Sequence, residues 1–351
     1  MQQDDPSYVP RRLRRERRHP VKVTILAVTM VVACILGVGG AYALKLNKAF
    51  DSAQVVAKED VLPTYSDQPY KDPGDQSMNI LLLGADKSET GAALDLTANG
   101  TDQRSDSMML VHIPEGHDHV YVMSIMRDTY VNIPGVGSDK INAALQYGGV
   151  PRLRMTIEKM LDVQIDHVAA IDFDGFRELT RAIGGVTVDN PKAFCAYKTT
   201  PDVCFEAGKI HIEGQRALKW VRERHAFLTS DYQRVKNQQQ FLKAVVSKVL
   251  SAEVMSSPNK IADVLGSMMP SVTMDSGLAD KQMLIGLAMQ MKDVRGKDIR
   301  NFTLPNAGTG QAGGASVVLN SPEWDLKVGN AMEQGTMEEL YASIPEEFKG
   351  K

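Results

Sequence analysis

The chain has 351 residues, of which 43% are hydrophobic and 24% are charged. These proportions are typical of a folded protein with one large domain or two ordinary ones, and they exclude a disordered, collagenous or disulfide-dense chain. With 40 basic and 43 acidic residues the formal net charge is −3. The chain as a whole is therefore not a polycation built to bind nucleic acid.

The N-terminal region joins a basic cluster to a long apolar stretch. Six arginines lie within residues 11–18, and residues 23–44 contain no charged side chain. A helix over this stretch is roughly 33 Å long, enough to cross a hydrocarbon core of about 30 Å. Because basic residues beside a span stay in the cytoplasm, we predict a cytoplasmic tail over 1–22 and a single transmembrane signal-anchor over 23–44. The remainder should lie outside the cytoplasmic membrane.

Two alternatives compete with this interpretation. Ala41-Tyr42-Ala43 fits the cleavage site of a signal peptide, although the apolar stretch exceeds the usual length of about 7–15 residues. The arginine run could also be a nucleic-acid patch or a localisation signal. Its position against an apolar span argues against that reading.

Residues 45–77 are predicted to form a stalk that ends in a turn-rich segment with Pro69, Pro73 and Gly74. From residue 78 the pattern is that of an α/β domain. Short apolar runs predict strands over 78–84, 107–114, 119–125, 168–173 and 186–188. Helical patterns cover 151–162, 176–185 and 232–250.

We place the core of the domain at 78–252 and a helical C-terminal layer of the same domain at 253–345. This layer includes a methionine-rich stretch, a glycine-rich loop, a short strand and a final helix. The methionines are interpreted as core filler, with an adaptable lipid groove as the alternative.

Charged and amide side chains lie where the apolar strands begin or end, and others lie in and before the helix predicted over 232–250. They are Asp86, Arg104, Asp106, Arg127, Asp128, Lys140, Asn142, Arg222, Arg224, Asp231, Arg234 and Gln238. Arg222 and Arg224 should point to the same side if their segment is extended, and Arg234 and Gln238 share one face of a helix. Surface ion pairs are the alternative for any one of these charges.

Strand ends converge in the crevice where α/β sheets bind ligands, so these side chains should lie close together. Guanidinium groups bind phosphate oxygens in a bidentate way. Mg²⁺ takes one or two protein carboxylates and accepts further oxygens from substrate phosphates. The set therefore predicts a site for a polyanion bridged by a divalent metal.

Seven sequence runs, in order from 78 to about 250, resemble the LytR-CpsA-Psr family of membrane-anchored, extracytoplasmic phosphotransferases. They are NILLLGAD, RSDSMMLVHIP, SIMRDTYVNIPG, KINAALQYGG, FRELTRAIGGVTV, GKIHIEGQRALKWVRERH and DYQRVKNQQQFLKAV. The resemblance implies a three-layer αβα sandwich with a hydrophobic prenyl-lipid tunnel. It also implies transfer of a glycopolymer from a polyprenyl-pyrophosphate carrier to a peptidoglycan hydroxyl through a phosphodiester.

The resemblance also implies roles for individual residues. Asp86 and Asp106 would hold Mg²⁺, with Mn²⁺ as the alternative. The pyrophosphate would be surrounded by Arg104, Arg127, Arg222 and Arg224, supported by Arg234 and Gln238. Substrate positioning would fall to Lys140, Asn142 and Asp128. The general base is left open, with Asp106 and Asp128 as candidates. Asp86, Arg104, Asp106, Arg127 and Asp128 form the implied catalytic set.

Three positions depart from the family pattern. Lys87 stands where an arginine is common, and Met126 stands where a proline is common. Asn237 occupies a position that is frequently arginine, which weakens the expected grip of the last helix on phosphate.

Other functions are compatible with parts of this pattern. A non-catalytic binding protein for lipid-linked wall glycans would need the same arginines. Without an acceptor, water could replace the hydroxyl and give a side pyrophosphatase activity. Transcriptional attenuation, an older association of the family name, has no helix-turn-helix to support it. The identity of the glycopolymer is open at this level.

Cys195 and Cys204 are nine positions apart in a segment that looks like a loop. Outside the membrane such a pair favours a disulfide, and two unpaired thiols are the alternative. Cys34 lies in the predicted span and should behave as a small apolar residue. The histidines show no zinc-ligand spacing.

Overall fold

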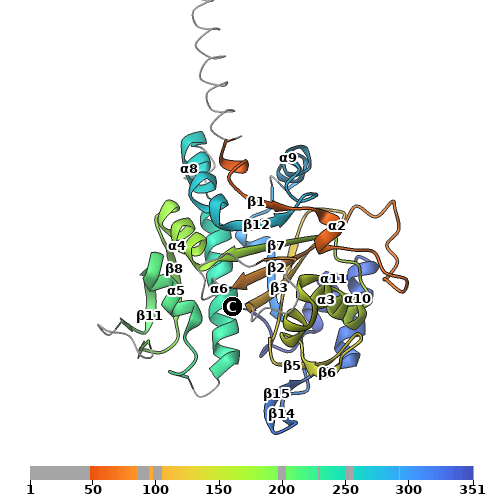
Figure 1. Ribbon diagram of the computed structural model, residues 1–351. Helices are drawn as coiled ribbons and strands as arrows, with labels where there is room; N and C mark the ends of the chain where they lie inside the picture. The colour runs from red at the N-terminus through yellow and green to blue at the C-terminus, as the bar shows by residue number, and fades with distance from the viewer. Residues whose placement is uncertain are drawn as a thin grey trace, which may run out of the picture. The chain divides into compact units, whose positions relative to one another are not determined.

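A seven-stranded mixed sheet forms the centre of the computed structural model (Figure 1). Its strands lie in the order β1 (Gln54–Val56), β12 (Val272–Asp275), β7 (His167–Asp172), β2 (Met78–Ala85), β3 (Ser105–Ile113), β4 (Val120–Ile125) and β13 (Ile299–Thr303). The structure describes residues 48–85, 95–97, 105–196, 203–227, 230–249, 251, 257–291 and 293–350.

Both faces of this sheet are buried under helices. Leu81 and Leu83 of β2 belong to the cluster that includes side chains of α3 (Ala143–Leu161), α10 (Pro322–Glu333) and α11 (Met337–Ser343). Ile80 and Leu82 pack into the cluster with α6 (Ser230–Val249), α8 (Pro258–Met268) and α9 (Lys281–Gln290). Because successive side chains of a strand point to opposite faces, a strand buried on both faces needs a continuous apolar run.

Smaller elements flank the central sheet. On one side lie α4 (Phe173–Ala182), α5 (Gly214–Arg222), the pair β8 (Val186–Asn190) and β11 (Gly208–Ile212), and the hairpin β9 (Phe194–Cys195) with β10 (Cys204–Phe205). A second sheet has the order β14 (Thr309–Ala312), β15 (Ala315–Leu319), β5 (Thr129–Ile133) and β6 (Gly137–Lys140). Short helices are α2 (Lys58–Val61), η1 (Met269–Ser271) and η2 (Gly296–Asp298).

The main strands agree closely with the sequence prediction. The runs 78–84, 107–114, 119–125 and 168–173 are β2, β3, β4 and β7, and the helix predicted over 232–250 is α6. The helix predicted from Pro151 is the second part of α3, which is kinked at Gly148 and Gly149. Gly149 has φ 62°, a conformation that glycine adopts without steric strain, so the helix restarts at Pro151.

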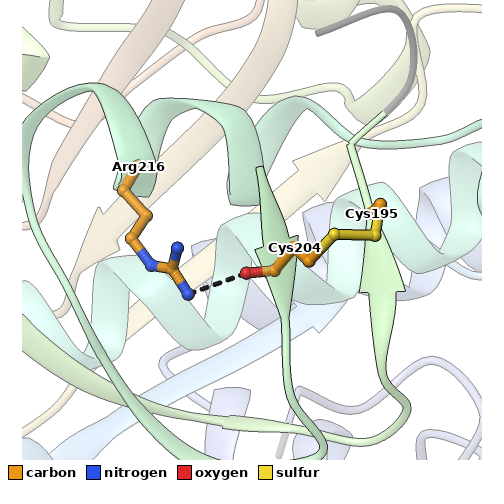
Figure 2. Close-up of a disulfide and its surroundings, with 3 residues drawn as sticks. All are labelled: Cys195, Cys204 and Arg216. Atoms are coloured by element: carbon orange, nitrogen blue, oxygen red, sulfur yellow. Dashed lines mark hydrogen bonds between the residues drawn. A yellow bond between two sulfur atoms is a disulfide. The ribbon is translucent and has the colours of Figure 1, made fainter. Parts of the chain in front are cut away.

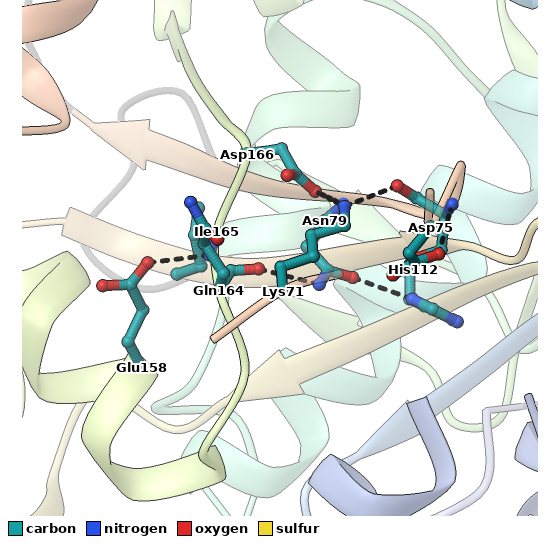
Figure 3. A network of polar contacts seen from close by, with 9 residues as sticks. Lys71, Asp75, Asn79, His112, Glu158, Gln164, Ile165 and Asp166 are labelled. Carbon is teal, nitrogen blue, oxygen red and sulfur yellow. Dashed lines mark hydrogen bonds and ion pairs between the residues drawn. The ribbon is translucent and has the colours of Figure 1, made fainter. Parts of the chain in front are cut away.

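Residues 45–77, predicted as a stalk, contribute to the fold from Lys48 onward. β1 pairs in parallel with β12 from Gln54↔Thr273 to Val56↔Asp275. Lys71 donates to Asp166 at 2.7 Å, and Figure 3 shows this contact beside the Asn79–His112 pair. The attachment was not predictable from composition, because it depends on partners far away in the sequence.

Two further predictions concern the ends of the chain. The segment 253–345, expected to be a helical layer, also supplies β12 and β13 to the central sheet. The tail at 1–22 and the span at 23–44 lie outside the described residues. Within the part that the structure describes, no helix is long and apolar enough to cross a membrane.

Candidate active site

An apolar cavity of about 350 Å³ lies between the central sheet, α4, α5, α6 and α8. Its walls are side chains of neighbouring strands and of the helices that cover them. They include Leu82, Met109, Ala170, Ile171, Phe173, Phe176, Leu179, Leu218, Val221, Arg222, Gln238, Phe241, Leu242, Val245, Met268 and Val272. The exposed surface inside is almost wholly apolar, so the cavity suits a hydrocarbon ligand.

A second cavity, of about 460 Å³, is polar and mainly cationic. It is lined by Arg127, Ala196, Gln215, Leu218, Lys219, Arg222, Glu223, Arg224, His225 and Arg234. Five of these side chains are arginine or lysine and one is a carboxylate. Such a surplus of positive charge favours an anionic ligand with several oxygens, such as a phosphate group.

The two cavities have two lining residues in common, Leu218 and Arg222 of α5. The Arg222 guanidinium carbon lies 4.1 Å from the centre of the Phe173 ring, and Phe173 lines the apolar cavity. Stacking on an aromatic face is a common arrangement for arginine. One ligand with an apolar tail and an anionic head could therefore occupy both cavities at once.

Arg127 reaches the cationic cavity from the turn between β4 and β5. Asp128 lies beside it, with Nε of Arg127 3.6 Å and Nζ of Lys140 2.9 Å from its carboxylate oxygens. Asn142 fixes this turn, because its N–H donates to Arg127 O at 3.2 Å and its Oδ1 accepts from Ser105 N at 3.1 Å. The three predicted positioning residues thus lie at or beside the turn that carries Arg127.

Asp86 and Arg104 lie outside the described residues, as does the side chain of Asp106. The backbone nearby is informative. Ala85, just before Asp86, pairs across β2 and β3 with Ser105, just before Asp106. The end of β2 and the start of β3 are therefore neighbours in the sheet. Among the side chains that the structure describes, no group of three or more His, Cys, Asp or Glu could hold a metal.

Helix α6 supplies polar side chains to both cavities. Arg234, 5% exposed, lines the cationic cavity, and Gln238 lines the apolar one. Both therefore face the site, as their helical spacing predicted. Asn237 has a different role, because it is buried and its Nδ2 donates to Trp220 O at 3.3 Å. The amide joins α6 to α5, which a longer arginine would disturb.

The segment of Arg222 and Arg224 is not the extended strand that sequence reasoning assumed. Arg222 is the last residue of α5, and Glu223 leaves the helix with φ −67° and ψ 130°. Both arginines still line the cationic cavity. Arg224 Nε donates to His225 Nε2 at 3.4 Å.

Cys195 and Cys204 form a disulfide between β9 and β10, which confirms that pairing (Figure 2). Arg216 Nη2 donates to Cys204 O at 2.8 Å. Ala196, next to Cys195, lines the cationic cavity. The bridge therefore holds a wall of that cavity.

Several residues of the site were missed by sequence reasoning. Phe173, Gln215, Lys219 and Glu223 line the cavities but are ordinary helix or helix-end residues in the sequence. Tyr232, expected only as the start of a helix, lines neither cavity, and its hydroxyl donates to Asn306 Oδ1 at 2.8 Å. Burial raises the pKa of Tyr232, so the phenol stays protonated near neutral pH. Only the run VRERH gave a signal, since it places a carboxylate between two arginines.

Comparison with known proteins gives consistent matches. The model of the LytR_cpsA_psr family matches residues 42–330. The polyisoprenyl-teichoic acid–peptidoglycan teichoic acid transferase TagT of Bacillus subtilis (strain 168) is 31% identical over 304 residues, covering 84% of this chain and 91% of that protein. The corresponding transferase TagU of Bacillus cereus (strain AH820) is 33% identical over 300 residues, covering 84% of this chain and 90% of that one.

Solved structures agree with this relationship. The crystal structure of B. subtilis TagV has a TM-score of 0.61 and 25% identity, covering 75% of this chain and 98% of that chain. A structure of TagT bound to LIIa-WTA has a TM-score of 0.59 and 25% identity, covering 80% and 99%. The mixed α/β fold is therefore that of these proteins.

Proposed function

The chain belongs to the LytR-CpsA-Psr family, and from that premise we propose that it is a glycopolymer transferase. It moves a glycopolymer from a polyprenyl-pyrophosphate carrier to a peptidoglycan hydroxyl and leaves a phosphodiester link. The observation that carries this proposal is Arg222, which lines both the apolar and the cationic cavity. The similar proteins TagT and TagU are teichoic acid transferases, which favours a teichoic acid as the polymer.

The carrier lipid matches the two cavities in chemistry. Its prenyl chain would enter the apolar cavity, which serves as the lipid tunnel. The chain would be removed from water there, which is favourable for an apolar group. Its pyrophosphate would lie among Arg127, Arg222 and Arg224, with Arg234 and Gln238 behind it on α6. Arg104, just before the start of β3, is proposed for the same group.

Transfer forms one bond from the acceptor oxygen to the phosphorus that bears the glycopolymer. It breaks the bond from that phosphorus to the bridging oxygen, and prenyl phosphate leaves. The arginines are already in position before the reaction begins, so they stabilise the negative charge that develops on the leaving phosphate. The acceptor proton goes to a carboxylate, for which Asp106 and Asp128 are the candidates. Lys140 holds Asp128 at 2.9 Å, and Asn142 fixes the turn beside it.

A divalent metal fits the proposed reaction. Asp86 and Asp106 would hold Mg²⁺ or Mn²⁺, and the pairing of Ala85 with Ser105 supports this because it brings the end of β2 beside the start of β3. When bound, such an ion neutralises charge on the phosphate oxygens.

We also propose a location outside the cytoplasmic membrane, with a single-pass anchor over 23–44 and the N-terminus in the cytoplasm. The disulfide between Cys195 and Cys204 supports this, because such bridges persist in oxidising compartments. The partners in this location are the lipid-linked glycopolymer, the peptidoglycan acceptor and the membrane, with no nucleic acid.

The test uses the full chain in detergent with a lipid-pyrophosphate-linked glycan, peptidoglycan and Mg²⁺. We expect polymer attached to peptidoglycan together with an equal amount of released prenyl phosphate, and loss of both with a chelator. Tight binding of the lipid without release would identify a non-catalytic binding protein and overturn the proposal. Omitting the acceptor measures the side pyrophosphatase activity.

A further inference from the structure

We propose that Glu223 is a positioning residue that holds Arg224 in place for the anionic head group. This inference rests on the proposed function for the identity of that head group. Glu223 follows Arg222 directly, lines the cationic cavity and is 6% exposed. A buried carboxylate in an anion site requires an explanation, because it repels the ligand that the arginines attract.

The explanation lies in the hydrogen bonds of one carboxylate oxygen. Oε1 of Glu223 accepts from the backbone N–H groups of Arg224 at 2.9 Å, His225 at 2.6 Å and Ala226 at 3.0 Å. Three consecutive N–H groups thus converge on a single oxygen. The chain continues in a turn closed by Phe227 N donating to Arg224 O at 3.4 Å.

These bonds set the course of the backbone immediately after α5. The helix ends at Arg222, and Glu223 is extended, so no helical hydrogen bond fixes the next residues. Hydrogen bonds to a charged acceptor are the stronger kind and hold the turn in one conformation. Arg224 therefore enters the cavity from a fixed backbone, and less of its side-chain freedom is lost when the ligand binds.

Two substitutions separate this role from the charge of the carboxylate. Glu223→Gln keeps an oxygen acceptor at the same distance from the backbone and removes the negative charge. Glu223→Ala removes the acceptor. Glu178→Ala is the matched control, because Glu178 lies on the outer side of α4, half-exposed and paired with Arg181.

The experiment uses the full chain in detergent and measures binding of inorganic pyrophosphate together with hydrogen exchange of residues 224–226. We expect Glu223→Ala to weaken binding about tenfold, equivalent to about 1.4 kcal/mol, and to speed exchange in that segment. Glu223→Gln should stay within about threefold of the parent protein in both measurements. The double variant Glu223→Ala, Arg224→Ala should bind pyrophosphate no more weakly than Arg224→Ala alone. Both changes remove the same interaction, which is that of Arg224 with the ligand.

Three results would overturn the inference. They are unchanged binding in Glu223→Ala, equal losses in the Gln and Ala variants, and fully additive effects with Arg224→Ala. Failure of the proposed function is read separately, from the release of prenyl phosphate by the unmodified chain. Pyrophosphate binding and hydrogen exchange report on Glu223 whether or not that release occurs.

Discussion

The guanidinium carbon of Arg222 lies 4.1 Å above the centre of the Phe173 ring, at the junction of an apolar and a cationic cavity. The aromatic face orients a group that must also bind phosphate oxygens. A lysine at this position keeps the charge but loses the planar stacking and the bidentate geometry. The contact therefore predicts that charge alone is insufficient at residue 222.

Arg222→Lys should lower kcat/KM for the lipid-pyrophosphate substrate by about tenfold to a hundredfold, since two features of the guanidinium are lost. The measurement is the release of prenyl phosphate. Arg216→Lys is the control, because Arg216 also stacks on a phenylalanine, Phe205, but lines neither cavity. Equal activities of Arg222→Lys and the parent protein would show that stacking has no role.

Arg127→Ala and Asp106→Ala should each abolish most transfer. The first change removes a cation from the site of the pyrophosphate, and the second removes a proposed ligand of the metal. Arg181→Ala is the control and should retain activity, because Arg181 is more than half exposed on α4, pairs with Glu178 and lines neither cavity. Full activity in both site variants would exclude these roles.

Filling the apolar cavity should select against long lipids. Leu242→Trp adds volume where α6 lines the cavity, so a polyprenyl substrate should lose activity more than a substrate with a short prenyl chain. The ratio of kcat/KM for the two lipids is the measurement. Leu326→Trp, on the exposed side of α10, should leave the ratio unchanged.

Removing the disulfide should destabilise the fold. In the chain-entropy model, closing so short a loop contributes roughly 2–3 kcal/mol to the free energy of unfolding. The variant with both Cys195→Ser and Cys204→Ser should therefore unfold at lower urea concentration. A reductant should lower the midpoint of the parent protein and leave that of the variant unchanged. If the reductant lowered the midpoint of the variant and of the parent protein equally, its effect would be due to a group other than this disulfide.

His112 should make the fold sensitive to acid. Burial lowers the pKa of His112 to about 4, and the side chain is 2% exposed. An unfolded histidine has a pKa near 6.5, so the unfolded chain binds the proton first as pH falls. The contribution is fully present above pH 6.5 and is lost between about pH 6.5 and 4, at roughly 1.4 kcal/mol per pH unit.

The free energy of unfolding, measured by urea titration across this pH range, tests this expectation. His112→Gln should flatten the dependence, because glutamine does not titrate. His211→Gln changes a histidine on the exposed side of β11 and is the control. An unchanged slope in His112→Gln would assign the acid sensitivity elsewhere.

Some parts of the fold were predictable because burial leaves a mark on the sequence. β2 and β4 are enclosed on both faces and appear as continuous apolar runs. The short strand predicted before the final helix is β15, but β1, β5 and β6 are short and partly polar, and they are defined by partners elsewhere in the fold. No local pattern distinguishes such strands from loop.

The arginines of the cationic cavity were predictable from the sequence, because an anionic ligand requires cationic side chains. Arg127, Arg222, Arg224 and Arg234 line one cavity, as their positions beside strands and helices suggested. The predicted conformation of the segment at Arg224 was wrong, because an extended segment with alternating side chains was assumed where helix α5 ends. Glu223 was missed because a carboxylate between arginines is usually an ion pair, and its backbone contacts depend on the turn.

β1 is the shortest strand of the central sheet and forms its edge, and it is the first strand that the chain enters after Lys48. Tension applied to the preceding chain would act on its three residue pairs with β12 before it reached the cavities. Tearing off β1 would leave the order from β12 to β13 intact. β1 would therefore be the first strand of the central sheet to separate under such a load.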